Sequence, residues 1–163
     1  MDKIPGYPHL PHALSETQAI PSLFSPEMEC TLLNPPSTTL DTVASALQSA
    51  TLAHFACHGT NNRHDPSQNA LLLSDRPLTL RKLVGLQRQD NPGYLAYLSA
   101  CETFDSKTRD LEEECLHLTS AFLGVGRFAH VVGTLWKVWN EVSRRVAVRD
   151  YEEFAVKSKS REN

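Results

Sequence analysis

Two segments, LAHFACHG (residues 52–59) and YLAYLSACET (residues 94–103), decide how this chain is interpreted. Each contains a short apolar run typical of a buried β-strand, and each run ends near a reactive side chain, His58 in the first and Cys101 in the second. Sites in open parallel sheets form at the carboxyl ends of the strands. If the two strands are neighbours, the imidazole and the thiol meet at one edge of the sheet.

Helix and strand signals alternate along the rest of the chain. Thr39 is a predicted N-cap, and Leu40, Val43 and Leu47 follow it at helical spacing. Strands are predicted at 52–57, 94–100 and 130–136, a hairpin at 70–80, and further helices at 80–86, 111–123 and 141–154. This alternation predicts an α/β fold with a mostly parallel sheet covered by helices on both faces.

The N-terminal part has weaker signals. Residues 15–18, Ser-Glu-Thr-Gln, have the form of a capping box, and Pro21 limits the helix after them to a short or kinked one. Leu32 and Leu33 form a candidate short strand.

Composition and charge exclude several classes of protein. The 163 residues suit one domain, which we place at 1–156, with a polar tail at 157–163. A net charge of −3 without a dense basic run argues against nucleic-acid binding. No apolar stretch approaches the roughly 18 residues of a membrane span, and no secretion signal is visible. The four cysteines lack paired spacing, so we expect reduced thiols and a cytoplasmic protein.

The chemistry of the two strand ends has two interpretations. An imidazole beside Cys101 raises the thiolate fraction of a group whose free pKa is about 8.5, which creates a nucleophile. The backbone N–H groups of Gly59 and Cys101 are then candidate oxyanion donors. The alternative is structural: a strand cysteine is usually a small core residue, and a histidine at a strand end is often a structural group. Spacing alone leaves both open.

Four phrases, in order and spacing, resemble the CHAT domain, a family of caspase-like, separase-related cysteine peptidases. The resemblance covers residues 5–151 and rests on HFACHG (54–59), LLLSD with LTL (71–80), LSACET (98–103) and VVGTLW (131–136). It implies the three-layer caspase–hemoglobinase fold. It also implies that His58 and Cys101 form a catalytic dyad that hydrolyses peptide bonds in a protein or peptide substrate through a thioester, without a metal or other cofactor.

Some members of this wider group prefer a basic residue before the scissile bond, which requires an acidic pocket. Asp110, Glu113 and Glu114 are the candidates for such a pocket. The competing interpretation is a solvated helix start, since acidic residues favour the first turn. A zinc site built from His54, His58, Cys57 and Cys101 is a weaker alternative, because the chain has no C-x-x-C pair.

Departures from the family pattern lead us to expect a domain that is incomplete at both ends. The family's first core strand would end where Met1 stands, Asn140 replaces a usual Asp, and little sequence follows Tyr151. The tetratricopeptide-type repeats frequent in the family are absent from this chain, so such repeats are expected only as partners. The rival to a peptidase is therefore an inactive interaction or regulatory module with the same fold.

Overall fold

The computed structural model describes residues 6–7, 9–60, 62, 64–86, 92–99, 111–124, 128–133 and 140–159. For residues 111–117, 140 and 157–159 the description extends to the backbone only. The helical elements are α1 (Ala13–Ala19), the 3-10 helix η1 (Ile20–Leu23), α2 (Leu40–Ser49), the 3-10 helix η2 (Pro66–Gln68), α3 (Leu80–Gly85), α4 (Leu111–Gly124) and α5 (Asn140–Lys159). The strands are β1 (Leu52–Phe55), β2 (Gly59–Thr60), β3 (Ala70–Leu71), β4 (Leu78–Thr79), β5 (Gly93–Leu98) and β6 (Phe128–Gly133).

The main sheet is parallel, as the alternation of strands and helices predicts. Its order is β1-β5-β6, and Leu98 of β5 lies between Phe55 of β1 and Gly133 of β6. Helices α3 and α4 lie in the connections between successive strands, because parallel strands need a long crossover. The predicted hairpin forms strands β3 and β4 of a second, antiparallel sheet with the order β2-β3-β4.

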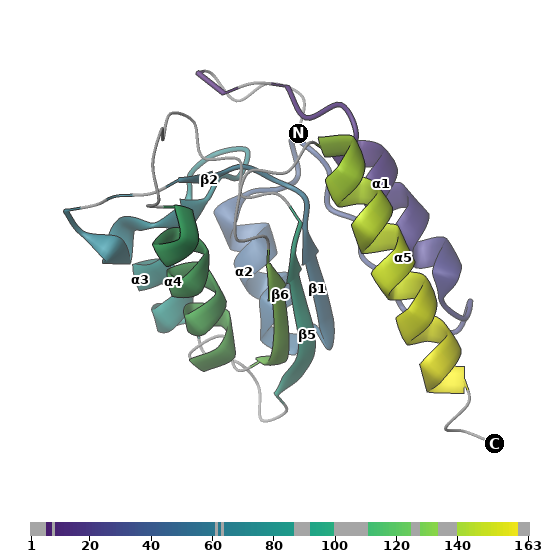
Figure 1. Cartoon of the computed structure of the whole chain (residues 1–163). Helices are drawn as coiled ribbons and strands as arrows, with labels where there is room; N and C mark the ends of the chain where they lie inside the picture. The colour runs from purple at the N-terminus through teal and green to yellow at the C-terminus, as the bar shows by residue number, and fades with distance from the viewer. Residues whose placement is uncertain are drawn as a thin grey trace.

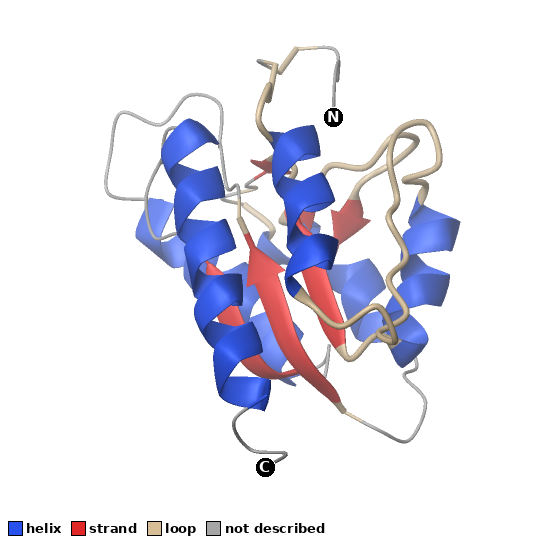
Figure 2. Ribbon diagram, turned by 90° about the vertical axis from the view of Figure 1, so that its right-hand side faces the viewer, coloured by secondary structure: helices blue, strands red, loops and turns tan. Residues whose placement is uncertain are grey.

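Helices cover both faces of the parallel sheet, which confirms the three-layer arrangement. Figure 1 shows α1 and α5 on one side of the sheet and α2, α3 and α4 on the other. Figure 2 shows α1 and α5 in front of the strands. Strand β5 is buried on both faces: Ala96 and Leu98 belong to the core beside α2, α3 and α4, and Leu95 and Tyr97 to the core beside α5. This double burial explains why its sequence is apolar almost throughout.

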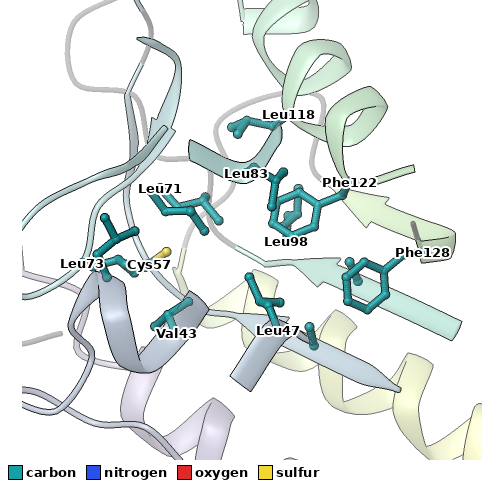
Figure 3. Close-up of a cluster of buried hydrophobic side chains, with 14 residues drawn as sticks. Val43, Leu47, Cys57, Leu71, Leu73, Leu83, Leu98, Leu118, Phe122 and Phe128 are labelled. Carbon is teal, nitrogen blue, oxygen red and sulfur yellow. The ribbon is translucent and has the colours of Figure 1, made fainter. Parts of the chain in front are cut away.

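The larger core is centred on Phe122 of α4, which is fully buried (Figure 3). Its ring centroid lies 5.4 Å from that of Phe55 in β1 and 6.1 Å from that of Phe128 in β6. One side chain thus ties a helix to both outer strands of the sheet. Burial of a phenylalanine contributes about 1.5–3 kcal/mol to stability.

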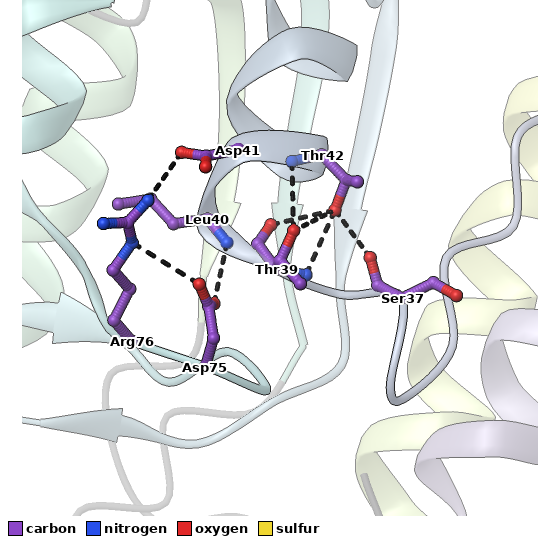
Figure 4. Close-up of polar contacts among 7 residues, drawn as sticks. All are labelled: Ser37, Thr39, Leu40, Asp41, Thr42, Asp75 and Arg76. Carbon is purple, nitrogen blue, oxygen red and sulfur yellow. Dashed lines mark hydrogen bonds and ion pairs between the residues drawn. The ribbon is translucent and has the colours of Figure 1, made fainter.

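Thr39 is the N-cap of helix α2, as the sequence predicts. Two sets of hydrogen bonds fix the start of this helix, one between Thr39 and Thr42 and one to Asp75 (Figure 4). The Thr39 hydroxyl accepts a hydrogen bond from the Thr42 N–H at 3.3 Å, and the Thr42 hydroxyl accepts one from the Thr39 N–H at 3.1 Å. Asp75, on the turn between β3 and β4, accepts the Leu40 N–H at 2.8 Å. Arg76 lies 2.7 Å from Asp41. The capping of α2 therefore also anchors the hairpin turn.

Two expectations for the N-terminal part are wrong. Helix α1 begins at Ala13, so Ser15 and Thr17 lie inside it, and their hydroxyls donate to the backbone carbonyls of His12 and Ala13 instead of capping. Within the described residues, Leu32 and Leu33 form no strand, because no neighbouring strand pairs with them. The effect expected of Pro21 is confirmed: α1 has seven residues, and Pro21 sits in the first turn of η1, where its missing N–H is tolerated.

Helix α5 is the longest in the described part of the chain and continues to Lys159, three residues into the segment predicted as a polar tail. None of the described helices is long and apolar enough to cross a lipid bilayer.

Candidate active site

The ends of β1 and β5 lie together, which is the condition on which the dyad hypothesis depends. Phe55, the last residue of β1, pairs with Leu98, the last residue of β5. The Ser99 N–H donates to the Phe55 carbonyl at 2.9 Å, so the two strands stay aligned to their final residues. The segments that follow β1 and β5 therefore begin at the same edge of the sheet, which is the usual place for a site in a parallel sheet.

His58 follows β1 directly and is deeply buried, with 1% of its surface exposed. Its carbonyl accepts the Leu72 N–H at 2.8 Å, which fastens this turn to the antiparallel sheet. Its ring centroid lies 5.2 Å from the ring of Tyr7, with an angle of 39° between the planes. His58 stands three residues beyond Phe55, the end of β1, and its burial was not foreseen.

Gly59, the candidate oxyanion donor, begins strand β2 opposite Leu71. Residues of an antiparallel pair alternate between hydrogen-bonded and non-hydrogen-bonded positions. Because the Leu72 N–H donates to the His58 carbonyl, Gly59 and Leu71 form a non-hydrogen-bonded pair. The Gly59 N–H consequently points away from β3 and is not used in the ladder.

Cys57 lies immediately before His58 but has the properties of a core residue. It is 2% exposed and packs with Val43, Leu71 and Leu73 in the large core (Figure 3). Burial raises the pKa of its thiol to about 12. Since a thiolate is the reactive form of cysteine, Cys57 is unsuited to be a nucleophile at neutral pH.

The remaining predicted site residues lie wholly or partly outside the described residues. Cys101 and Asp110 are not among them, and Glu113 and Glu114 are described only as backbone positions in α4. The dyad distance and the acidic pocket therefore stay predictions.

The other strand histidine, His54, takes part in a polar cluster on the α1 and α5 side of the sheet. Its Nε2 lies 3.0 Å from Oε1 of Glu16, a residue of α1 that is 2% exposed. The His54 ring also contacts Tyr97 and Tyr151, and the Tyr97 hydroxyl donates to Asp150 at 2.9 Å. Burial and the hydrogen bond to Asp150 raise the pKa of Tyr97, while burial and the nearby carboxylates raise that of Tyr151.

This cluster bears on the zinc alternative. The His54 side chain is engaged with a helix on one face of the sheet, whereas Cys57 packs into the core on the opposite face. Among the described side chains, no three His, Cys, Asp or Glu residues are grouped to hold a metal ion.

Two contacts near the strand ends were not predicted from sequence. The ring of Tyr7, close to the N-terminus, reaches His58 across the fold. Ser99, just beyond β5, is buried and bonded through its hydroxyl and carbonyl to the Ser143 hydroxyl of α5. Ser99 stands two residues before Cys101 in the sequence. Neither contact has a local sequence signal.

Comparison with known families gives a match to the family described as "CHAT domain" over residues 3–162, nearly the whole chain. A comparison with curated proteins gives no match. The match, together with the parallel β1-β5-β6 sheet and its covering helices, agrees with the caspase-like fold expected from the sequence.

Proposed function

This chain belongs to the CHAT domain family, a caspase-like, peptidase-related family, and on that basis we propose that it is a cysteine-type endopeptidase. One observation carries the proposal: β1 and β5 are adjacent, parallel and aligned at Phe55 and Leu98. His58 follows Phe55 by three residues, and Cys101 follows Leu98 by three residues. Equal sequence offsets from two aligned strand ends support the proposal that the two side chains meet at this edge of the sheet.

In the proposed reaction, His58 removes the thiol proton of Cys101, and the sulfur attacks the carbonyl carbon of the scissile peptide bond. His58 then gives that proton to the departing amine, which leaves a thioester on Cys101. A water molecule, deprotonated by His58, attacks the thioester and releases the second product and the free thiol. The His58 imidazole alternates between base and acid, as in other acyl-transfer sites.

The backbone N–H of Gly59, together with that of Cys101, would stabilise the oxyanion of each tetrahedral intermediate. The orientation of the Gly59 N–H away from β3 supports this role, because the donor is not used in the strand ladder. Such a donor contributes about 3–4 kcal/mol to stabilisation of the transition state.

Specificity for a basic residue before the scissile bond is part of the same proposal. Asp110, Glu113 and Glu114 follow Cys101 within 13 residues and would supply the negative charge. In the alternative, these residues are a solvated start of α4, where acidic side chains are favourable in any case.

The second candidate function is an inactive interaction or regulatory module. The observation in its favour is the burial of His58, which has 1% of its surface exposed and stacks near Tyr7. A general base must reach the substrate, so the peptidase requires His58 to become accessible when the substrate binds.

Covalent labelling of the protein distinguishes the peptidase from the inactive module. The probe is a peptide that carries a thiol-reactive group directly after a lysine. Cys30 is exposed, so the measurement uses a Cys30→Ser background to remove its reaction. The proposal predicts labelling that maps to Cys101, disappears in Cys101→Ala and falls at least about 100-fold in His58→Ala, the usual size of general-base effects. A matched probe with glutamate in place of lysine should react more slowly.

Three outcomes would contradict the proposal. Labelling that persists in Cys101→Ala would show that Cys101 is not the nucleophile. Labelling that is unchanged in His58→Ala would show that His58 does not activate the thiol. Labelling of Cys101 without hydrolysis of any fluorogenic lysyl or arginyl peptide supports the inactive module.

A further inference from the structure

A cavity of about 600 Å³ is lined by the whole of β1 and by the two residues after it, Ala56 and Cys57. Residues 51–57 form one side of it, and residues 28–35 form the opposite side. Helices α1 and α2, from the two different layers, contribute the remaining walls. The cavity therefore lies in the plane of the sheet, between the two helical layers. A further strand added beside β1 would occupy this position.

The backbone of β1 presents hydrogen-bonding groups to this cavity. The carbonyls of Thr51 and Phe55 accept the N–H groups of Leu95 and Ser99, at 3.2 and 2.9 Å, on the β5 side. Alternate residues of a strand direct their backbone groups to opposite edges. The N–H and C=O groups of Leu52, His54 and Ala56 consequently point to the outer edge, and no residue described by the structure forms a backbone hydrogen bond with them there.

The opposite side of the cavity is similar. Residues 29–33 have neither helix nor strand, and their backbone forms no hydrogen bond with any other part of the described chain. The apolar side chains of Leu14, Met28 and Leu32 line the cavity and remain 39%, 40% and 42% exposed. Backbone groups that have no backbone partner among the described residues, and apolar groups exposed at the rim, are both unfavourable unless something covers them.

We propose that this cavity is a docking slot for an extended peptide strand of a partner protein, which adds to the edge of β1. A strand is the occupant whose backbone complements alternating N–H and C=O groups. Because helices lie above and below the slot, the strand must be apolar on both faces, like β5. Residues 51–57 span about 20 Å, which corresponds to a docked strand of about five or six residues. The proposal does not depend on peptidase activity.

The test uses a peptide that copies β5, Gly-Tyr-Leu-Ala-Tyr-Leu, with two lysines added at each end for solubility. Amide hydrogen exchange is followed by NMR with and without the peptide. Binding in the slot should slow the exchange of the Leu52, His54 and Ala56 amides at least tenfold and leave those of Ala53 and Phe55, already bonded to β5, nearly unchanged. Two versions of this peptide carry N-methyl groups at alternate residues, one at the odd and one at the even positions. One version should bind at least tenfold more weakly than the other, because only one set of N–H groups faces β1.

A pair of variants checks the position of the slot. Ala46 of α2 lines the cavity, and Ser45 beside it is exposed and does not. Ala46→Trp should weaken peptide binding at least tenfold, while Ser45→Trp should leave it unchanged. The N-methyl comparison needs no variant, so it remains decisive if Ala46→Trp fails to fold.

Four results would overturn the proposal. The first is no binding at millimolar peptide. The second is equal binding of both N-methylated peptides, which indicates a pocket for an apolar ligand rather than a strand. The third is protection of Leu52, His54 and Ala56 in the free monomer, which means that the chain pairs its own edge. The fourth is protection that appears only with a concentration-dependent dimer in sedimentation, which assigns the slot to a second copy.

Discussion

At the scale of single residues, Cys57 shows that a cysteine beside the candidate base need not be a nucleophile. Cys57 precedes His58 in sequence, yet its thiol is packed into the core and its pKa is raised to about 12 by burial. The proposed nucleophile, Cys101, follows the end of β5 by three residues in the sequence. Adjacency in sequence is therefore a poor guide here, since the strand turns Cys57 into the core.

The raised pKa of Cys57 predicts a pH dependence of stability. The folded thiol keeps its proton to about pH 12, whereas the unfolded thiol loses it near its ordinary value of 9.0. The contribution of Cys57 is thus complete below pH 9 and declines as the pH rises toward 12. Urea unfolding of the wild type and of Cys57→Ala between pH 8 and 10.5 should show a difference that shrinks with pH, by at most about 1.4 kcal/mol per unit. A difference independent of pH would contradict the assignment.

Glu16 and His54 form the most buried ionisable contact between α1 and the sheet among the described residues. Glu16→Ala leaves a ring nitrogen of His54 without its acceptor, which should lower the free energy of unfolding by about 1–3 kcal/mol. Glu27→Ala, at an exposed position, is the control and should change stability by less than about 0.5 kcal/mol. Equal effects in urea unfolding would mean that the contact does not hold α1 to the sheet.

At the scale of elements, α2 shows how a local signal fixes a helix start. Thr39 and Thr42 bond reciprocally, and Asp75 adds a carboxylate from the hairpin turn. Desolvation alone would raise the pKa of Asp75, but hydrogen bonds from the Leu40 and Arg76 N–H groups outweigh it and lower the pKa. The contribution of the Asp75 charge is therefore present above the ordinary carboxyl pKa of about 3.9 and is lost as the pH falls through the lowered value.

Removing the cap of α2 should have a measurable effect. Thr39→Ala deletes the acceptor for the Thr42 N–H and should lower the free energy of unfolding by about 1 kcal/mol. Ser45→Ala, in the exposed middle of the same helix, should be neutral or slightly stabilising because alanine favours helices. Thermal unfolding followed by circular dichroism distinguishes the two, and a neutral Thr39→Ala would show that Asp75 suffices as a cap.

At the scale of the whole molecule, Phe122 joins helix α4 to both outer strands of the parallel sheet. Phe122→Ala leaves a cavity in the large core and should lower the free energy of unfolding by about 3–5 kcal/mol. Leu123 is the next residue and is 45% exposed, so Leu123→Ala should have a much smaller effect. Similar losses for the two variants would contradict the placement of α4.

The architecture was predictable from sequence where the signals are local. Three elements have such a signal: the capping threonine of α2, the apolar run of β5 and the hairpin at residues 70–80. The alternation of helices and strands implies the parallel sheet. Contacts between distant segments were not predictable in this way. Tyr7 reaches His58, and Glu16 reaches His54, only because the fold brings separate segments together.

The same distinction applies to the candidate site. The register of Phe55 with Leu98 shows that the two motif-bearing strands are neighbours, a condition that the sequence left open. The resemblance to the family supplied the roles of His58 and Cys101, and spacing alone left a structural interpretation open. The slot beside β1 had no signal in sequence, since it depends on which strand lies at the edge.

The central claim is that His58 activates Cys101, and the pH dependence of alkylation tests it most directly. In a Cys30→Ser background, the rate of reaction of Cys101 with iodoacetamide is measured from pH 5 to 10 by mass spectrometry. The account predicts appreciable reaction at neutral pH and, in His58→Ala, a profile shifted to that of an ordinary thiol near pH 8.5. Superimposable profiles for the two proteins would contradict it.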